Sequence, residues 1–199
     1  KYYNDYKINL FIGYMLRHDP RIIFLKSKIE NKLNKVKYAN FFLQTFMPEW
    51  HPWENYHKSY ASNKTLGGGV LLTCSHEIDL SVFLFGNAKE VFCTYTKSFL
   101  KTDVENSLIL VIKHKNGITS NITLDFSSKV EKKRNFQIYL DKSSYCWDFY
   151  KSSILINING RKSFGVPSKS SSISKIYNYQ NETILKNIVK KFKRKNFID

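Results

Sequence analysis

His76 is the side chain best suited to chemistry near neutral pH, because an imidazole passes a proton to or from a hydroxyl or carbonyl group. It lies in the stretch LGGGVLLTCSHEIDLSVFLFG, residues 66–86. Thr73 comes three residues before it and Asp79 three residues after it, a spacing that puts side chains on one face of a helix. Asp79 is placed either to orient the imidazole or to face solvent. A single helical histidine is more often structural than catalytic, so the spacing alone leaves both roles open.

Three consecutive glycines, Gly67–Gly69, precede this predicted helix. Such a run has a large entropic cost on folding, so the backbone there must meet a special requirement. One interpretation is the close approach of a ligand to the helix N-terminus, where free N–H groups favour anions such as phosphates. The other is a tight turn packed under a neighbouring element. The residue types favour the two interpretations equally.

The elements before the glycines are expected to alternate between strand and helix. INLFIGYML (8–16) reads as a buried strand, and Pro20 suits the first turn of a helix. RIIFLKSKIENKL (21–33) has apolar residues at helical spacing, and KVKYANFFLQTF (35–46) is typical of a strand. Residues 47–69 follow as a long loop with two tryptophans. VLLTCSHEIDLSVFLFG (70–86) is expected to be a helix with Leu72, Ile78, Val82 and Phe85 on its buried face and Gly86 at its end.

After Gly86 the pattern predicts consecutive short strands. These are residues 88–99, two strands within 107–126 joined at Lys-Asn-Gly, and then residues 135–140, 143–149 and 152–158. The Ser-rich segment 161–175 is expected to be a loop. A helix over 181–195 closes the chain, with Ile184, Ile188 and Phe192 on its apolar face. The order predicts an α+β fold: an open, mostly antiparallel β-sheet with helices packed on one face.

The bulk composition is that of a globular chain with its own core. It has 199 residues, 42% of them hydrophobic, and a mean hydropathy of −0.39. The apolar runs are far shorter than the roughly 20 residues that a membrane span needs. The start KYYNDYKINLF lacks a signal-peptide cleavage site, so we expect a cytoplasmic protein. Cys74, Cys93 and Cys146 are odd in number and far apart, which predicts reduced thiols.

The net charge of +16 suggests nucleic acid or an anionic membrane surface as a partner, with the basic terminal helix as the contact. Because lysines are spread along the whole chain, we favour a solvated surface and expect neither partner. A metal site built from His51, His57, Cys74 and His76 is a further alternative. Their spacing matches no zinc motif, so no metal is expected.

Several stretches together resemble one family. LGGGVLLTCSHEIDLSVFLFG resembles the segment of the Gfo/Idh/MocA oxidoreductases in which a Gly-rich turn leads into a helix carrying an active-site histidine. FIGYMLRHDP (11–20) is similar to the family's last Rossmann strand and its crossing into the second domain. MPEWHPWENYHKSYASNKTLGGG (47–69) is similar to the loop that contacts substrate. Residues 101–126 and 135–149 resemble its sheet segments, so the likeness covers about residues 8–195.

The resemblance implies two parts. Residues 1–16 would be the remnant of the last strand of a dinucleotide-binding domain, and residues 17–199 an α+β substrate-binding and oligomerisation domain. The chain would be the substrate-binding part of an NAD(P)-dependent oxidoreductase acting on the CH–OH group of a sugar or nucleotide sugar. It would form a homo-oligomer through its sheet.

The family's glycine fingerprint and its Glu-Lys-Pro lysine are missing from the sequence. NAD or NADP would therefore serve the complete enzyme without binding tightly to this chain alone. The chain is expected to be inactive without the cofactor domain. The alternative is a catalytically dead domain that serves only self-association.

The resemblance also assigns roles to residues. His76 would face the reacting hydroxyl and transfer its proton. Thr73 stands where many members carry an aspartate, and it would contact substrate without acting as a charged acid or base. Tyr14 and Arg17 would bind substrate at the seam between the domains, although Arg17 is equally suited to a structural ion pair.

The loop supplies the remaining predicted substrate contacts. Trp53, Tyr56 and Lys58 would line the sugar or phosphate side. One of the two tryptophans, Trp50 or Trp53, is expected to fix the loop by burying its ring.

Overall fold

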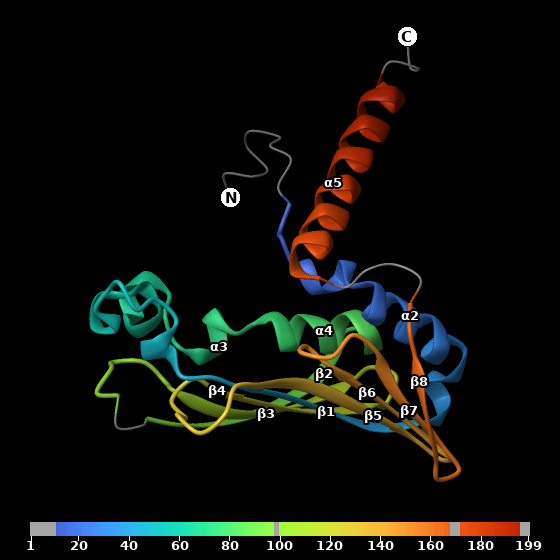
Figure 1. Ribbon diagram of the computed structural model, residues 1–199, viewed down its shortest axis with the longest axis horizontal. Helices are drawn as coiled ribbons and strands as arrows, with labels where there is room; N and C mark the ends of the chain where they lie inside the picture. The colour runs from blue at the N-terminus through green and yellow to red at the C-terminus, as the bar shows by residue number, and fades with distance from the viewer. Residues whose placement is uncertain (1–10, 98–99, 168–171, 196–199) are drawn as a thin grey trace.

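The computed structural model describes residues 11–97, 100–167 and 172–195. It is built on an eight-stranded sheet with helices over one face, and the other face is left open (Figure 1). This confirms the predicted α+β class with an open, mostly antiparallel sheet. The elements in chain order are α2 (Pro20–Ile29), β1 (Val36–Gln44), α3 (Val70–Thr73), α4 (His76–Phe85), β2 (Ala88–Thr96), β3 (Ser107–His114), β4 (Thr119–Asp125), β5 (Lys133–Leu140), β6 (Ser143–Asp148), β7 (Ile154–Ile158), β8 (Arg161–Gly165) and α5 (Ile173–Lys195).

The first strand of the chain lies in the middle of the sheet. The strand order is β2-β3-β4-β1-β5-β6-β7-β8, with β1 parallel to β4 and antiparallel to β5. The other neighbours pair antiparallel, and β3 and β4 form the hairpin predicted at Lys-Asn-Gly. β1 suits the centre because Ala39, Phe41 and Leu43 alternate as buried residues along it.

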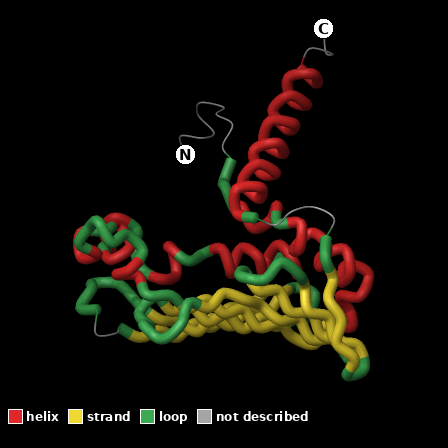
Figure 2. The backbone as a smooth tube through the Cα atoms, viewed as in Figure 1, coloured by secondary structure: helices red, strands yellow, loops and turns green. Residues whose placement is uncertain are grey.

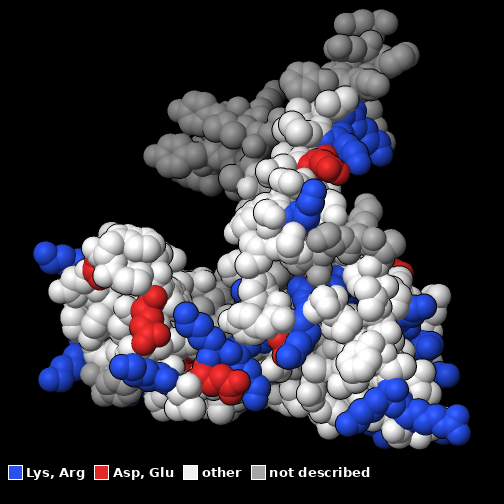
Figure 3. Space-filling model, in the orientation of Figure 1, with Lys and Arg blue, Asp and Glu red and all other residues white. Residues whose placement is uncertain are grey.

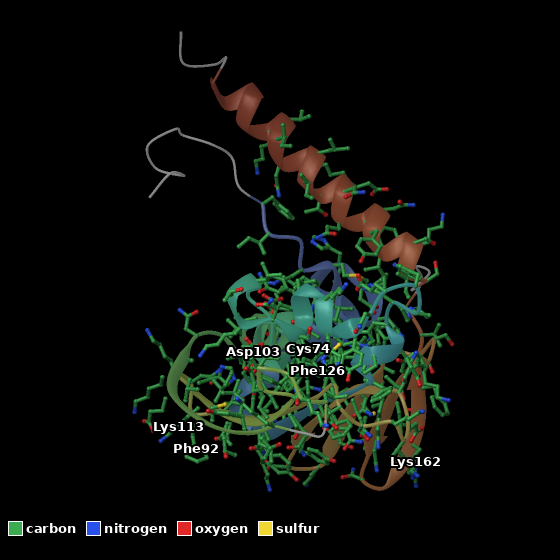
Figure 4. The ribbon with its side chains drawn as sticks, turned by 90° about the vertical axis from the view of Figure 1, so that its left-hand side faces the viewer. Cys74, Phe92, Asp103, Lys113, Phe126 and Lys162 are labelled. Atoms are coloured by element: carbon green, nitrogen blue, oxygen red, sulfur yellow. The ribbon has the colours of Figure 1, made fainter. Side chains whose placement is uncertain are left out.

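The core lies between the sheet and the helical layer formed by α2, α3 and α4 (Figure 2). α2 begins at the N-cap Asp19, whose side chain accepts a hydrogen bond from the Arg21 N–H, and Pro20 occupies its first position. Its buried apolar residues include Ile22, Leu25 and Ile29, as the spacing predicted. Figure 4 shows Cys74 and Phe126 where the helical layer meets the sheet, whereas Phe92 and Lys113 lie at the outer side of the sheet.

The strand predicted over residues 8–16 was wrong for its described part. Residues 11–14 have no regular structure, and Met15–His18 form a 3₁₀ turn in which Met15 and Leu16 are buried. This turn packs against α4 and α5, so its apolar side chains are covered by helices without sheet pairing. Residues 1–10 lie outside the described residues, and the domain division at residue 16 stays a prediction.

The single helix predicted over residues 70–86 is also corrected. The backbone leaves the helical conformation at Cys74 (φ −106°, ψ 32°), and the segments on either side are bent by 50°. The bend turns Leu72 outward, where it is 60% exposed, and Ile78 and Val82 are only partly buried. Phe85 is buried as predicted, together with Leu80 and Leu84, and Gly86 ends the helix with a positive φ of 84°, as a terminating glycine is expected to do.

Two predictions at the end of the chain change as well. Arg161–Gly165 forms the edge strand β8 because it pairs with β7, and only the remainder of the predicted loop is irregular or outside the described residues. α5 begins at Ile173 and extends away from the sheet (Figure 1). On its predicted apolar face, Ile188 is 39% exposed and Ile184 is partly buried. The side chain of Phe192 lies outside the described residues.

Among the described residues, no single helix is long and apolar enough to cross a membrane. The bent pair Lys64–Thr73 and His76–Phe85 reaches that length and composition when its two parts are taken together. On the face shown in Figure 3, Lys and Arg are scattered over several elements, with Asp and Glu among them. The three cysteines are free thiols, as predicted.

His114 joins α4 to the sheet, and it gives stability a pH dependence. Its side chain is fully buried, with Nδ1 2.7 Å from the Gly86 carbonyl and Nε2 2.9–3.0 Å from the hydroxyls of Ser120 and Ser81. Burial lowers the pKa of His114 below 6.5, although the bond to Gly86 opposes the shift. In the unfolded chain the imidazole titrates near pH 6.5, so the unfolded state takes up the proton first on acidification.

We therefore expect the free energy of unfolding to fall as the pH is lowered from 7.5 to 5.5. Urea titrations at both pH values measure this loss. His114→Gln should make the loss smaller, whereas His57→Gln, at an exposed histidine, should leave it unchanged. An undiminished loss in His114→Gln would contradict the assignment.

Candidate functional site

The three glycines form a turn that packs tightly against the preceding loop. Gly68 N–H and Gly69 N–H donate to the carbonyls of Asn63 and Ala61, both at 2.9 Å. A Cβ at Gly68 would lie 2.3 Å from the Tyr60 carbonyl oxygen. The absence of side chains therefore lets two backbone segments touch.

Glu105 already accepts hydrogen bonds from the backbone N–H groups at the N-terminus of α3. The backbone carbonyl of Glu105 accepts from Val70 N–H and its carboxylate accepts from Leu71 N–H, both at 3.1 Å. Gly69 has φ 102°, and a Cβ there would lie 2.3 Å from Glu105 Oε1. Of the two interpretations of the glycines, the structure shows the packed turn, with a carboxylate of the chain where an anionic ligand would otherwise bind.

A cavity of about 280 Å³ lies beside the break between α3 and α4. Its walls come from the end of β1, the loop around Trp50, the start of β5 and the segment after β6. The polar groups and aromatic rings that shape it include Tyr60, Thr73, Cys74, His76, Arg134 and Tyr150. Thr73 and His76 thus meet at one cavity, although the helix between them is broken.

His76 is held as a neutral, half-buried imidazole. Its ring packs edge-on against Tyr14, with centroids 5.8 Å apart and an interplanar angle of 87°. Its pKa is lowered from 6.5, mainly by burial and then by the positive charge of Arg134, while Asp79 opposes the shift. A neutral imidazole at pH 7 is able to accept a proton from a substrate hydroxyl.

Asp79 forms an ion pair with Arg17. Arg17 Nε and Nη2 donate to the two carboxylate oxygens at 2.8 and 2.5 Å, and Asp79 is buried. This contact raises the pKa of Arg17 and links the Met15–His18 turn to α4. Both carboxylate oxygens of Asp79 thus accept from the Arg17 guanidinium. Arg17 forms a structural ion pair, which was one of the two roles that the sequence left open for it. A substrate contact by Arg17 stays a prediction.

A second ion pair was missed from the sequence. Arg134 Nε donates to Glu77 Oε1 at 2.6 Å, and only 3% of the Glu77 side chain is exposed. Burial raises the pKa of Glu77 and the Arg134 charge opposes that rise. The signal was present in β5: Arg134 shares its alternation with Phe136 and Ile138, which face the core.

Cys74 is a cavity residue without nucleophilic character. Its thiol is buried, and burial together with the charge of Glu77 raises its pKa to about 12. The raised pKa therefore favours the protonated thiol at neutral pH.

The family of the chain follows from its match to a family model. Residues 30–146 match the family model described as the GFO/IDH/MocA C-terminal domain, which is more than half of the chain. This chain belongs to the Gfo/Idh/MocA family. The family resemblance seen in the sequence is thereby confirmed. No curated protein sequence matches the chain.

Solved structures show the same Gfo/Idh/MocA fold at low sequence identity. A levoglucosan dehydrogenase complexed with NADH and levoglucosan has a TM-score of 0.74 and 14% identity, over 90% of this chain and 57% of that one. A UDP-N-acetylglucosamine 3-dehydrogenase from Acidithiobacillus ferrooxidans has a TM-score of 0.65 and 15% identity, over 92% and 55%. An inositol dehydrogenase homologue from Azotobacter vinelandii, complexed with NAD⁺, has a TM-score of 0.66 and 14% identity, over 76% and 42%. The chain spans about half the length of these dehydrogenases.

Five of the six predicted substrate residues of this Gfo/Idh/MocA domain do not line the cavity: Tyr14 and Arg17, and Trp53, Tyr56 and Lys58 of the loop. Trp53 is 81% exposed and stacks on His51, the Tyr56 hydroxyl is 3.4 Å from the Leu100 carbonyl, and Lys58 is exposed. Their substrate contacts stay predictions.

Trp50 is the tryptophan that fixes the loop, as expected for one of the pair. Its Nε1–H donates to Thr45 Oγ1 at 2.9 Å and its ring packs on Phe126. His51 bonds with Glu54 at 2.7 Å, and no group of three or more metal-ligating side chains occurs among the residues that the structure describes.

Proposed function

We propose that the chain is the substrate-binding part of an NAD(P)-dependent oxidoreductase that acts on the CH–OH group of a sugar or nucleotide sugar. The observation that carries this proposal is a half-buried His76, its pKa lowered by burial, at a cavity of about 280 Å³ within a Gfo/Idh/MocA domain. The support from relatives is that their names include levoglucosan and UDP-N-acetylglucosamine dehydrogenases.

In this proposal His76 binds the reacting hydroxyl and accepts its proton. Tyr14 fixes the imidazole by its edge-on contact, and Thr73 offers a neutral hydroxyl at the same cavity. Burial of the imidazole keeps it unprotonated, which a proton acceptor requires.

The described residues do not fit a nicotinamide cofactor. The Gly-rich turn that would be a candidate for a pyrophosphate meets the carboxylate of Glu105, which repels a second anion. We therefore propose that NAD or NADP is held by a separate domain, and that the chain is inactive without it. A cytoplasmic location and the lack of nucleic-acid and membrane partners stay predictions.

Self-association is the second candidate function, and the open face of the sheet favours it. On this face Phe92 of β2 is 67% exposed and Ile109 of β3 is 50% exposed. An apolar surface of this kind on a sheet is typical of an interaction site. We propose that the chain forms a homo-oligomer through this face.

A titration with sugars and with NADH distinguishes substrate binding from self-association alone. We expect sugars to shift the imidazole NMR signals of His76 saturably, while NADH does not bind tightly. His76→Gln should remove those signals and His57→Gln should leave them unchanged. Light scattering on the same samples gives the oligomeric state. Oligomers that bind no sugar would contradict the enzymatic proposal and favour self-association alone, and tight binding of NADH would contradict a separate cofactor domain.

A further inference from the structure

The cavity at His76 is positively charged on its β5 side. Lys133 and Arg134 both line it, and no Asp or Glu is among its described lining residues. Glu77 lies behind Arg134, where it bonds with Nε and is itself buried. The charged side chains at the cavity wall are therefore all cationic hydrogen-bond donors.

Two polar atoms at this wall have no hydrogen-bond partner among the described residues. They are one terminal nitrogen of Arg134, Nη2, and the hydroxyl oxygen of Thr73; behind Arg134, Oε2 of Glu77 also has no partner among the described residues. The Arg134 guanidinium lies over the ring of Phe149, with its central carbon 5.2 Å from the centroid, so its position is fixed by packing as well as by Glu77. A buried donor without an acceptor is destabilising, and a ligand with an acceptor oxygen would supply the missing partner.

The size and charge of the cavity select the ligand. Small-molecule sites run from about 300 to 1,000 Å³, so a cavity of about 280 Å³ takes a monosaccharide-sized group. Guanidinium groups bind carboxylate and phosphate oxygens more strongly than neutral hydroxyls, because the hydrogen bonds are charge-assisted.

We propose that Arg134 and Thr73 form an anion-binding subsite, and that the substrate at this cavity is an acidic sugar. Its anionic group, a carboxylate or a phosphate, accepts from Arg134 while the sugar ring lies toward His76. This inference rests on the proposed sugar-binding function and adds the charge of the substrate to it.

The first arm of the test compares ligands on the unmodified chain. Calorimetry at physiological salt measures binding of glucuronate, glucose 1-phosphate and glucose. We expect at least one acidic sugar to bind ten-fold or more tightly than glucose. Glucuronate alone would identify a carboxylate as the anion, and glucose 1-phosphate alone would identify a phosphate.

The second arm changes the site without changing the net charge. Arg134→Gln alone would leave Glu77 buried and unpaired, so the variant tested is Glu77→Gln with Arg134→Gln. The matched control is Lys37→Gln with Asp141→Asn, which removes an exposed ion pair of 3.2 Å. We expect the preference for acidic sugars to disappear in the first variant, to remain in the control, and to weaken in Thr73→Val.

Three results would overturn the inference. Equal binding of glucose and the acidic sugars would show that there is no anion-binding subsite, but it would not contradict the proposed function. A preference that survives Glu77→Gln/Arg134→Gln would place the anion elsewhere. Failure of all three sugars to bind would contradict the inference and the proposed function together. If circular dichroism shows that the double variant is unfolded, the ligand comparison on the unmodified chain and the Thr73→Val variant still test the inference.

Discussion

Replacing Arg21 with alanine is expected to lower the free energy of unfolding by about 3–5 kcal/mol. Arg21 is 2% exposed and its guanidinium bonds with Asp19, which is fully buried. It also donates to the backbone carbonyls of Asp148, at 3.0 Å, and Lys151, and it lies over the ring of Trp147. Without it, the buried Asp19 carboxylate keeps the backbone N–H of residue 21 but loses its charged partner, the Asp148 carbonyl keeps only the Lys151 N–H among the bonds described, and the Lys151 carbonyl loses this donor.

Urea denaturation measures this change, and two further variants test its cause. Arg161→Ala removes an exposed arginine and should change stability by less than about 0.5 kcal/mol. Asp19→Asn with Arg21→Met should cost less than Arg21→Ala alone, because no unpaired charge stays buried. A loss below about 1 kcal/mol in Arg21→Ala would show that the network is not required.

Gly68→Ala is expected to cost about 3 kcal/mol or more, the upper range for overpacking. The added Cβ would meet backbone oxygens of Tyr60 and Ala61 at 2.3 and 2.7 Å, and backbone has no rotamer that relieves such contacts. The turn must therefore open, and with it the start of α3, which carries Thr73 to the cavity.

Gly67→Ala is the matched control for this substitution. Gly67 has φ 78°, and a Cβ added there would meet nothing within 4 Å, so alanine has only the left-handed backbone penalty, about 1–2 kcal/mol. Thermal and urea unfolding of both variants give the comparison. Equal losses would show that conformation, and not close packing, explains the glycines.

Both predictions concern the walls of the candidate site. Arg21 fixes the segment after β6, from which Phe149 and Tyr150 line the cavity. Gly68 fixes the loop that places Tyr60 on one side and Thr73 on the other. Loss of either contact should therefore weaken sugar binding along with stability.

The sequence by itself determined the elements whose pattern is local. α2 follows from Pro20 and the spacing of Ile22, Leu25 and Ile29, and the β3–β4 hairpin follows from Lys-Asn-Gly. Each depends on residues that are neighbours along the chain, where propensity and periodicity act directly. The family resemblance and the choice of His76 also came from a contiguous stretch.

Only the tertiary structure decided the features that depend on distant partners. β8 is a strand because β7 lies beside it, and Met15–His18 is a turn because α4 and α5 cover it. The cavity brings Arg134 of β5 to His76 of α4, and their sequence positions give no sign of that meeting. Burying an unpaired charge in a low-dielectric interior is costly. The pairs Glu77–Arg134 and Asp79–Arg17 satisfy this requirement, and they form only when folding brings these distant residues together.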